Sequence, residues 1–247
     1  MVNDFLENLS RALYIAEKDA KVYYFRAPNF TYGLLMPISL FFAFALTGQV
    51  HPAIIVSGLT ALAIMFGTTS IEAVAVVLEK QTGTFERLLA APVSFFTLIL
   101  GKAIAGVFFG LVLSAGMIIP LIVLSGTGIA NPVLFFVSVV FASLTFSALG
   151  VLVSAYAKWV PEAQMLDNFL RFPMAFLSGI FLPLTAIPSQ LQFIPRLLPL
   201  TYAVEALEVS VMHPGLTGTY LIDIFAMAFF SILFLALGVR VLQRKTM

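Results

Sequence analysis

The sequence predicts an all-α integral membrane protein with six transmembrane helices. Of the 247 residues, 61% are hydrophobic and only 10% are charged, and the mean hydropathy is +1.05. A soluble domain needs more charged residues than this to cover its surface. The apolar residues are gathered into long runs, and nearly all basic residues fall on one side of the predicted membrane. We therefore expect residues 1–247 to form one transmembrane domain.

Residues 1–27 precede the first long apolar run and are predicted to form an amphipathic helix on the cytosolic membrane surface. Apolar side chains recur there at helical spacing, and charged residues occupy the other face. These apolar positions are Phe5, Leu9, Ala12, Leu13, Ala16 and Ala20. A helix of this kind lies along the interface rather than across the membrane. It can serve as an anchor or as a lever that contacts a cytosolic protein.

Six apolar runs approach the roughly 20 residues that a transmembrane helix needs. They are residues 30–49, 53–78, 95–125, 133–157, 168–184 and 220–242. The fifth run is short and contains Pro173 and Pro183, so it is the least regular of the six. Pro120 predicts a tilt or a break in the long third run.

The lysine and arginine positions orient these spans, because basic residues are enriched in cytoplasmic segments. With six spans, 12 of the 13 basic residues fall on the side that carries both termini, and Arg196 is the exception. We therefore expect a multi-pass protein of the plasma or inner membrane with both termini in the cytoplasm.

The segment EKQTGTFERLLAAPVS, residues 79–94, is a charged insert between two apolar runs. Gly83 permits a turn, Thr84 is a good helix N-cap, and Glu86 places negative charge in the first helical turn. Pro92 ends this short helix. Because so short a helix is marginal in water, another surface must pack against it. The residues alone fit either a tight connector or a docking element for a cytosolic protein.

Residues 185–214 form a short helical region before the last span, and prolines divide it into pieces. Irregular backbone cannot face lipid, so this region lies outside the membrane or re-enters it under protein cover. We expect Thr201 to cap a helix there. The residues of interest in and beside this region are Pro183, Pro199, Thr201, Tyr202 and Glu205.

The insert resembles the cytosolic signature of the type-2 ABC exporter permease family, in which an acidic residue, Gly-Thr, Glu, Leu-Leu, Pro and Ser recur in this order. The stretch LSGIFLPLTAIPSQLQFIPRLLPLTYAVEAL, residues 177–207, is similar to the outer region of the same family. The order of the elements agrees over nearly the whole chain. The resemblance implies one permease domain, which pairs with a second copy as a homodimer and on which two ATP-binding subunits dock.

By this resemblance, residues 79–94 contain the coupling helix, which contacts the ATP-binding subunit. Its residues are Glu79, Gly83, Thr84, Glu86, Arg87, Leu88, Leu89 and Pro92. The N-terminal helix, with Leu9, Leu13 and Ala16, is implied to meet the same subunit, and the loop from Lys158 to Asp167 is a second contact. We expect the chain to be no enzyme and to hold no cofactor, with ATP and Mg²⁺ on the partner. A phosphate loop needs G-x-x-x-x-G-K-[ST], and the Gly101-Lys102 pair lacks that context.

Ionisable residues inside the membrane are candidate functional sites. Glu72 and Lys102 are expected about 10–12 Å from the cytosolic boundary on adjacent spans, where they can pair as a clasp or serve substrate or ion passage. Asp167 and Arg171 have the i, i+4 spacing of a local pair. The GxxxG pattern of Gly106 and Gly110 indicates close helix packing, within the chain or between two copies.

By analogy with the family, the substrate path runs between two copies. Candidate residues along it are Phe41, Phe44, Thr68, Thr69, Phe169, Phe172 and Phe176. The 25 phenylalanines, against 7 tyrosines and 1 tryptophan, favour an amphiphilic, drug-like or lipid-like substrate, because a phenyl ring brings no hydrogen-bonding group. Regulated lipid flipping remains an alternative to export.

Two other classes of protein are alternatives to a permease of this family. An ion-driven carrier would use Glu72 and Lys102, although internal repeats typical of such carriers are not evident. An intramembrane serine protease would use Ser178, but His213 is expected in an outer loop, away from the hydrogen-bond reach that catalysis needs. No metal site is predicted, since His51 and His213 lack companions at ligand spacing. The net charge of +1 does not suggest nucleic acid as a partner. The expected partners are membrane lipids and, by the resemblance, the ATP-binding subunit and a second permease copy.

Overall fold

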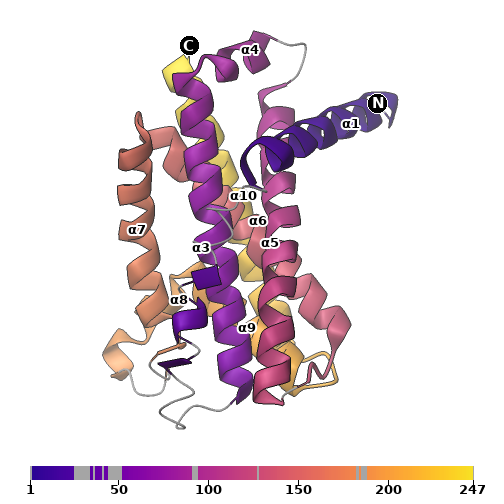
Figure 1. Cartoon of the computed structure of the whole chain (residues 1–247), viewed down its shortest axis with the longest axis vertical. Coiled ribbons are helices and arrows are strands. Elements are labelled where there is room, and N and C mark those ends of the chain that lie inside the picture. Colours follow the sequence, from indigo (N-terminus) through magenta and orange to yellow (C-terminus); the bar gives the residue numbers. More distant parts are fainter. Residues whose placement is uncertain are drawn as a thin grey trace.

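The computed structural model describes residues 2–24, 34, 35, 37–40, 42, 43, 52–90, 94–126, 128–181, 184 and 188–246. The described part of the chain is helical and contains no strand (Figure 1). Most of the first predicted span, residues 30–49, lies outside the described residues. So do five of the residues singled out above, which are Phe41, Phe44, His51, Pro92 and Pro183.

Four helices are long and apolar enough to cross a membrane. They are α3 (Pro52–Gln81), α5 (Phe95–Ser125), α6 (Pro132–Tyr156) and α10 (Gly218–Thr246). They agree with the predicted runs 53–78, 95–125, 133–157 and 220–242 to within a few residues at each end. The described residues therefore establish four candidate spans, whereas the prediction was six.

The predicted fifth span, residues 168–184, was placed wrongly. The helix in this part of the chain is α7 (Val160–Leu177), which begins eight residues earlier, beside Pro161 in its first turn, and ends before Gly179 with its φ of 93°. The apolar run missed this start because the first half of α7 contains Glu162 and Asp167. With Arg171 these charges also keep α7 out of the set of long apolar helices.

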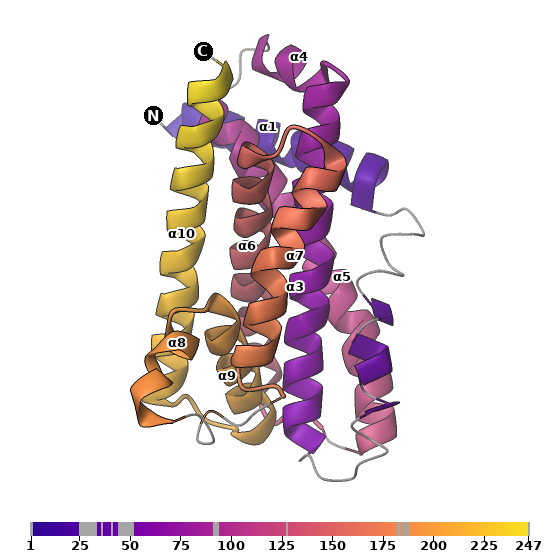
Figure 2. The same cartoon turned by 90° about the vertical axis from the view of Figure 1, so that its left-hand side faces the viewer.

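The remaining helices lie at the two ends of the bundle. At one end are α1 (Val2–Asp19), which continues as a π-helical turn Ala20–Tyr24, and α4 (Thr84–Ala90). The N-terminus, the C-terminus and α4 share this end (Figure 1), which we call the α4 end. The opposite end, the α9 end, carries α8 (Phe193–Arg196) and α9 (Pro199–Met212), as Figure 2 shows.

The core is built around α3, which packs against α5, α6, α7 and α9. Fully buried side chains such as Leu62 of α3, Phe146 of α6 and Leu207 of α9 belong to one apolar cluster. One face of α10 carries exposed side chains such as Ile222, Phe225 and Ile232. This is the distribution of a helix that faces its own bundle on one side and lipid on the other.

The GxxxG pattern on α5 packs against α6 of the same chain. A Cβ atom at Gly106 would lie 2.2 Å from Oγ of Ser147, and one at Gly110 would lie 2.0 Å from Oγ of Ser143. Because such distances are far below van der Waals contact, only glycine permits this approach of the two helices. The interpretation of the pattern as close packing within one chain is confirmed.

At the α9 end, short helices are joined by bonds from side chains to nearby backbone. Thr201 does not cap α9 as predicted, because the helix begins at Pro199 and places Thr201 inside the first turn. Its hydroxyl donates instead to the carbonyl of Pro195 over 2.7 Å, and the Tyr202 hydroxyl donates to the carbonyl of Arg196 over 2.7 Å. These bonds hold α8 to α9.

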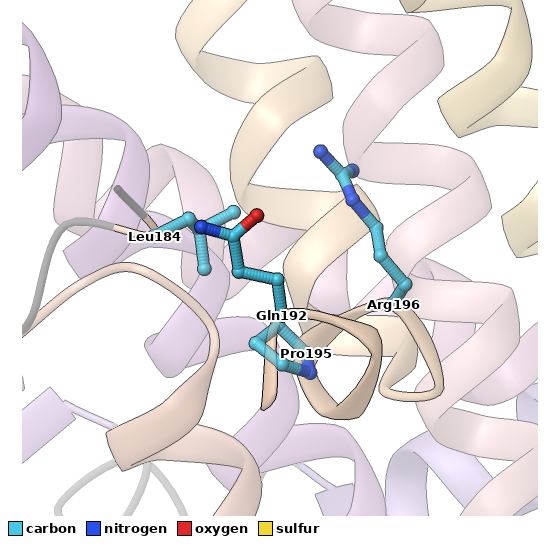
Figure 3. Close-up of a pocket in the computed structure, with 4 residues that line it drawn as sticks. All are labelled: Leu184, Gln192, Pro195 and Arg196. Atoms are coloured by element: carbon cyan, nitrogen blue, oxygen red, sulfur yellow. The ribbon is translucent and has the colours of Figure 1, made fainter. Parts of the chain in front are cut away.

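A shallow hollow of about 180 Å³ lies beside α8. Leu184, Gln192, Pro195 and Arg196 line it. Figure 3 shows Leu184 and Gln192 side by side, with the Arg196 side chain on the other side of Gln192. Arg196 donates to Oε2 of Glu205 over 2.6 Å, and this hydrogen bond raises the pKa of Arg196. The pair gives α8 a second link to α9.

Candidate functional site: the junction at the α4 end

The helix α4 begins directly after a tight turn at the end of α3. Gly83 has a φ of +68°, in the left-handed region that favours glycine, and the Thr82 hydroxyl donates to the carbonyl of Leu78 over 2.9 Å. Thr84 is the first residue of α4, and Glu86 lies in its first turn as predicted. The short helix is thereby held close to the end of α3.

One side chain anchors α4 to the rest of the molecule. Phe85 is fully buried and packs with Ile15 of α1, Val76 of α3 and Leu98 of α5. Its ring also meets the edge of Phe95 at a centroid separation of 6.3 Å. Burial of one phenylalanine contributes about 1.5–3 kcal/mol, which supplies the packing that so short a helix needs.

The opposite side of α4 is polar. Glu86 and Arg87 are exposed, and Leu88 is half-buried against the Phe85 cluster. The side chain of Leu89 and the position of Pro92 lie outside the described residues. The helix thus has an inner apolar face that joins three other helices and an outer charged face that is open at the α4 end.

Directly beside this anchor, two lysines and two carboxylates form a buried charge cluster. We use this name for Lys18 and Asp19 of α1, Glu79 of α3 and Lys102 of α5. The Lys102 ammonium lies 3.0 Å from Oδ2 of Asp19 and 2.6 Å from Oε2 of Glu79. The Lys18 ammonium lies 2.7 Å from Oδ1 of Asp19 and also contacts Oε1 of Glu79. Each carboxylate therefore lies between two ammonium groups.

Because the charge cluster is buried, each of its members depends on the others for its stability. Asp19, Glu79 and Lys102 are fully buried, and only Lys18 reaches solvent. Burial and the charge of Lys102 lower the pKa of the Lys18 ammonium, but Asp19 and Glu79 outweigh them and raise it overall. Removing one member of a buried ionic set leaves its partners uncompensated, which costs about 3–5 kcal/mol. The cluster therefore keeps α1, α3 and α5 together only while it is complete.

A glycine permits the crossing of α1 over α5. A Cβ atom at Gly101 would lie 2.7 Å from the carbonyl oxygen of Ala12 and 2.9 Å from Cβ of Ile15. This close approach brings Asp19 to Lys102, the residue next to Gly101 in the chain. On α1, Ala16 is buried whereas Leu13 is 52% exposed. The predicted contact of Leu9, Leu13 and Ala16 with the membrane surface or with a partner stays a prediction.

The expected pairing of Glu72 with Lys102 is not what the structure shows. Among the described residues, the ion-pair contacts of Lys102 go to Asp19 and Glu79. Glu72 is fully buried two helical turns deeper on α3 and interacts electrostatically with Lys102. The long Lys102 side chain extends toward the α4 end, where α1 contributes the carboxylate of Asp19. A prediction made from α3 and α5 alone does not include this carboxylate.

The end of α3 also holds α6. The Lys80 ammonium donates to the carbonyl oxygens of Ser154 over 2.6 Å and Ala157 over 2.9 Å. Gln81 donates from its side-chain amide to the carbonyl of Lys158 over 3.2 Å. Glu79 and Lys80 are thus consecutive residues that bind different neighbours, the first α1 and α5 and the second the end of α6.

The predicted local pair of Asp167 and Arg171 is confirmed, with 3.0 Å between Oδ2 and Nη2. It also joins α7 to α3, because Arg171 donates to the carbonyl of Phe66 over 3.0 Å and to the Ser70 hydroxyl. The Ser70 hydroxyl donates to Oδ2 of Asp167 over 3.0 Å. The structure therefore assigns this pair a packing role between helices.

The residues predicted along a substrate path differ in their solvent exposure. Thr68 and Thr69 are fully buried, and their hydroxyls donate to the carbonyls of Ile64 and Met65 over 2.7 Å each. They do not reach the surface of the single chain. In contrast, three phenylalanines of α7 are exposed. These are Phe169, Phe172 and Phe176.

Sequence reasoning missed Lys18, Asp19 and Phe85. A signal for Asp19 was present, because it continues the stripe of Ala12 and Ala16 at helical spacing and so lies on the packed face of α1. Phe85 follows Thr84 at the start of α4. Its position in the sequence alone does not predict which side chains bury it.

Long apolar helices, buried charges joining them and a short helix at one end are features of a multi-helix membrane protein, and comparison with known proteins identifies the family. Residues 14–212 match the family model described as "ABC-2 type transporter". The chain belongs to this family. The family is one of membrane transporters.

Three curated relatives illustrate the similarity. ABC transporter G family member 20 of Dictyostelium discoideum is 29% identical over 149 residues, which cover 59% of this chain and 20% of that protein. Inner membrane transport permease YadH of Escherichia coli K12 is 26% identical over 163 residues, 62% of this chain and 61% of the relative. Nodulation protein J of Sinorhizobium fredii is 30% identical over 101 residues, 40% and 38% of the two chains. The matched part is therefore less than two thirds of each relative's length.

Proposed function

We propose that this chain is the membrane-spanning permease subunit of an ATP-driven exporter. It moves an amphiphilic, drug-like or lipid-like substrate out of the cytoplasm, and a separate ATP-binding subunit supplies the energy. The observation that supports this function most directly is the junction at the α4 end. There a short helix exposes Glu86 and Arg87 on its outer face and inserts Phe85 among three other helices on its inner face.

The junction suggests how a movement of the partner reaches the membrane. A force on α4 acts through Phe85 on Ile15, Val76 and Leu98, which belong to α1, α3 and α5. The charge cluster joins the same three helices beside it. Packed interiors transmit displacement because they are dense and little compressible. We therefore assign α4 the role of the coupling helix, with Gly83 and Thr84 as its entry turn.

The ATP-binding subunit is proposed to hold ATP and Mg²⁺ and to be present in two copies. A second copy of the permease, as a homodimer, completes the substrate path along the exposed phenylalanines of α7. The distribution of charge supports an inner or plasma membrane orientation with the α4 end in the cytoplasm, because Lys18, Lys80, Arg87 and Lys158 lie at this end.

The decisive experiment is co-purification of this chain with its ATP-binding subunit. Wild type is compared with the double variant Glu86→Arg, Leu89→Asp in α4 and with Arg244→Glu as a control, an exposed charge reversal at the end of α10. We expect wild type and the control to retain the ATPase and alter its turnover, and the α4 variant to lose both effects. Folding of each variant is checked by its elution profile and thermal unfolding.

Two results would contradict the proposal. If the ATPase binds the α4 variant as well as wild type, α4 is only a connector between α3 and α5. If reconstituted vesicles transport substrate without any ATPase and depend on an ion gradient, the ion-driven carrier replaces the exporter.

A further inference from the structure

A narrow groove lies between α6 and α7 near the α4 end, with a volume of about 230 Å³. Its walls are Leu152, Val153 and Tyr156 of α6 and Leu166, Phe169 and Leu170 of α7. Apart from the Tyr156 hydroxyl, these side chains offer no polar group. Such a groove suits a hydrocarbon chain, because a polar ligand would lose its hydrogen bonds to water there without replacement.

The groove exists because α7 is held to α3 rather than to α6. Arg171 of α7 donates to the carbonyl of Phe66 on α3 and to the Ser70 hydroxyl. Small residues form the contact of the three helices, among them Ala157 and Ala163. On the outer side α6 and α7 diverge, and Phe169 stays 76% exposed.

The entrance of the groove has the features of a membrane boundary. Tyr156 is 54% exposed and Trp159 is 66% exposed, and these aromatic types are enriched at the level of lipid headgroups. The Lys158 side chain is exposed, and the Lys80 ammonium binds the end of α6. Glu162 carries the opposite charge, and its carboxylate accepts a hydrogen bond from the Lys158 backbone N–H over 2.7 Å. Two lysines and one glutamate therefore lie where α6 ends and α7 begins, beside this groove.

We propose that the groove between α6 and α7 is a phospholipid-binding site, which takes one acyl chain between Leu152 and Phe169 and an anionic phosphate beside Lys158. The surplus of positive charge selects an anionic over a zwitterionic headgroup. The lining side chains run from Leu152 to Tyr156 on α6 and from Leu166 to Leu170 on α7, about 6 Å along each helix axis, so the groove holds a segment of the acyl chain within the leaflet next to the α4 end. This site would take Phe169 from the substrate path proposed above and leave Phe172 and Phe176 to that path. A second copy of this chain is the competing occupant of the groove.

The chain contains a single tryptophan, Trp159, which lies in the connection between α6 and α7, three residues after Tyr156 of the groove wall. Its fluorescence is therefore a specific reporter of the groove. We would reconstitute the full chain in phosphatidylcholine vesicles that contain a small fraction of a lipid with brominated acyl chains. This brominated lipid is phosphatidylglycerol in one sample and phosphatidylcholine in the other, at the same fraction. Bromine quenches the fluorescence of a tryptophan that it contacts. We expect brominated phosphatidylglycerol to quench Trp159 more strongly at every fraction.

Two variants and two matched controls define the site. Lys158→Glu should remove the preference for phosphatidylglycerol, an effect of about fivefold or more in relative affinity, because one basic residue near a membrane surface contributes about 1 kcal/mol. Leu166→Phe narrows the groove and should weaken quenching by both lipids. Lys21→Glu on α1 and Leu221→Phe at the α9 end, both at exposed positions, should leave quenching as in wild type.

Three outcomes would overturn the proposal. Equal quenching by the two lipids means ordinary contact with bulk lipid. Quenching that Leu166→Phe does not change places the lipid elsewhere. Absence of quenching, together with cross-links from position 159 to a second copy, means that the groove belongs to an interface between copies. Because the test contains no ATPase, a negative result leaves the proposed transport function standing.

Discussion

The two ends of the molecule attach short helices to the same bundle by different means. At the α4 end, Asp19, Glu79 and Lys102 are buried charges from helices far apart in the sequence. At the α9 end, the hydroxyls of Thr201 and Tyr202 bond to backbone only six residues away. The first arrangement unites three helices and depends on each member. The second holds two neighbouring helices and loses little when one bond is removed.

The largest expected effect is at the charge cluster. Lys102→Met leaves Lys18 as the one remaining cation of the cluster for the two carboxylates of Asp19 and Glu79, and the uncompensated buried charge should destabilise the protein by about 3–5 kcal/mol. Thermal unfolding in detergent would measure the loss. The double variant Lys102→Met, Asp19→Asn should recover part of it, because the excess negative charge of the cluster is then gone. The exposed variant Lys21→Met is the control. Equal stability of Lys102→Met and wild type would show that the cluster does not hold the α4 end together.

A smaller effect is expected where α1 crosses α5. Gly101→Ala adds a Cβ atom 2.7 Å from the backbone oxygen of Ala12, which cannot move without moving α1. We expect a cost of about 1–3 kcal/mol and faster proteolysis of the N-terminal segment, measured by limited digestion and mass spectrometry. Gly215→Ala has open space around it and should digest as wild type. If Gly101→Ala also behaves as wild type, α1 is not packed closely on α5.

The smallest effect is expected at the α9 end. Thr201→Val keeps the shape of the side chain but removes its hydrogen bond to the carbonyl of Pro195, and should cost about 0.5–1.5 kcal/mol, the net contribution of a typical intramolecular hydrogen bond. Measured by the same thermal unfolding, it should stay below Lys102→Met. A reversal of this order would remove the contrast between the two ends.

The sequence predicted the parts of the fold that depend on local composition. The apolar runs located α3, α5, α6 and α10, because membrane-length hydrophobicity is a property of one segment. It placed α7 wrongly, because the helix starts in polar residues before its apolar part. The partners of Lys102 were also missed, since Asp19 is 83 residues away and only the crossing at Gly101 brings it near.

For the candidate site, the turn at Gly83 and the position of Glu86 followed from local rules of helix starts. The burial of Phe85 did not, because its neighbours come from α1, α3 and α5 together. The coupling role of these residues stays a prediction until the co-purification experiment is done.

The consecutive residues Glu79 and Lys80 also bear on which changes of length this chain can tolerate. Successive residues of an α-helix are about 100° apart around its axis. Insertion or deletion of one residue in the last turns of α3 would therefore turn Glu79 away from Lys102 and Lys80 away from the end of α6 at the same time. An insertion in the exposed segment near Gly215 would disturb neither contact. We expect a library of single-residue insertions to be depleted of functional members at the end of α3, while the loop before α10 accepts them.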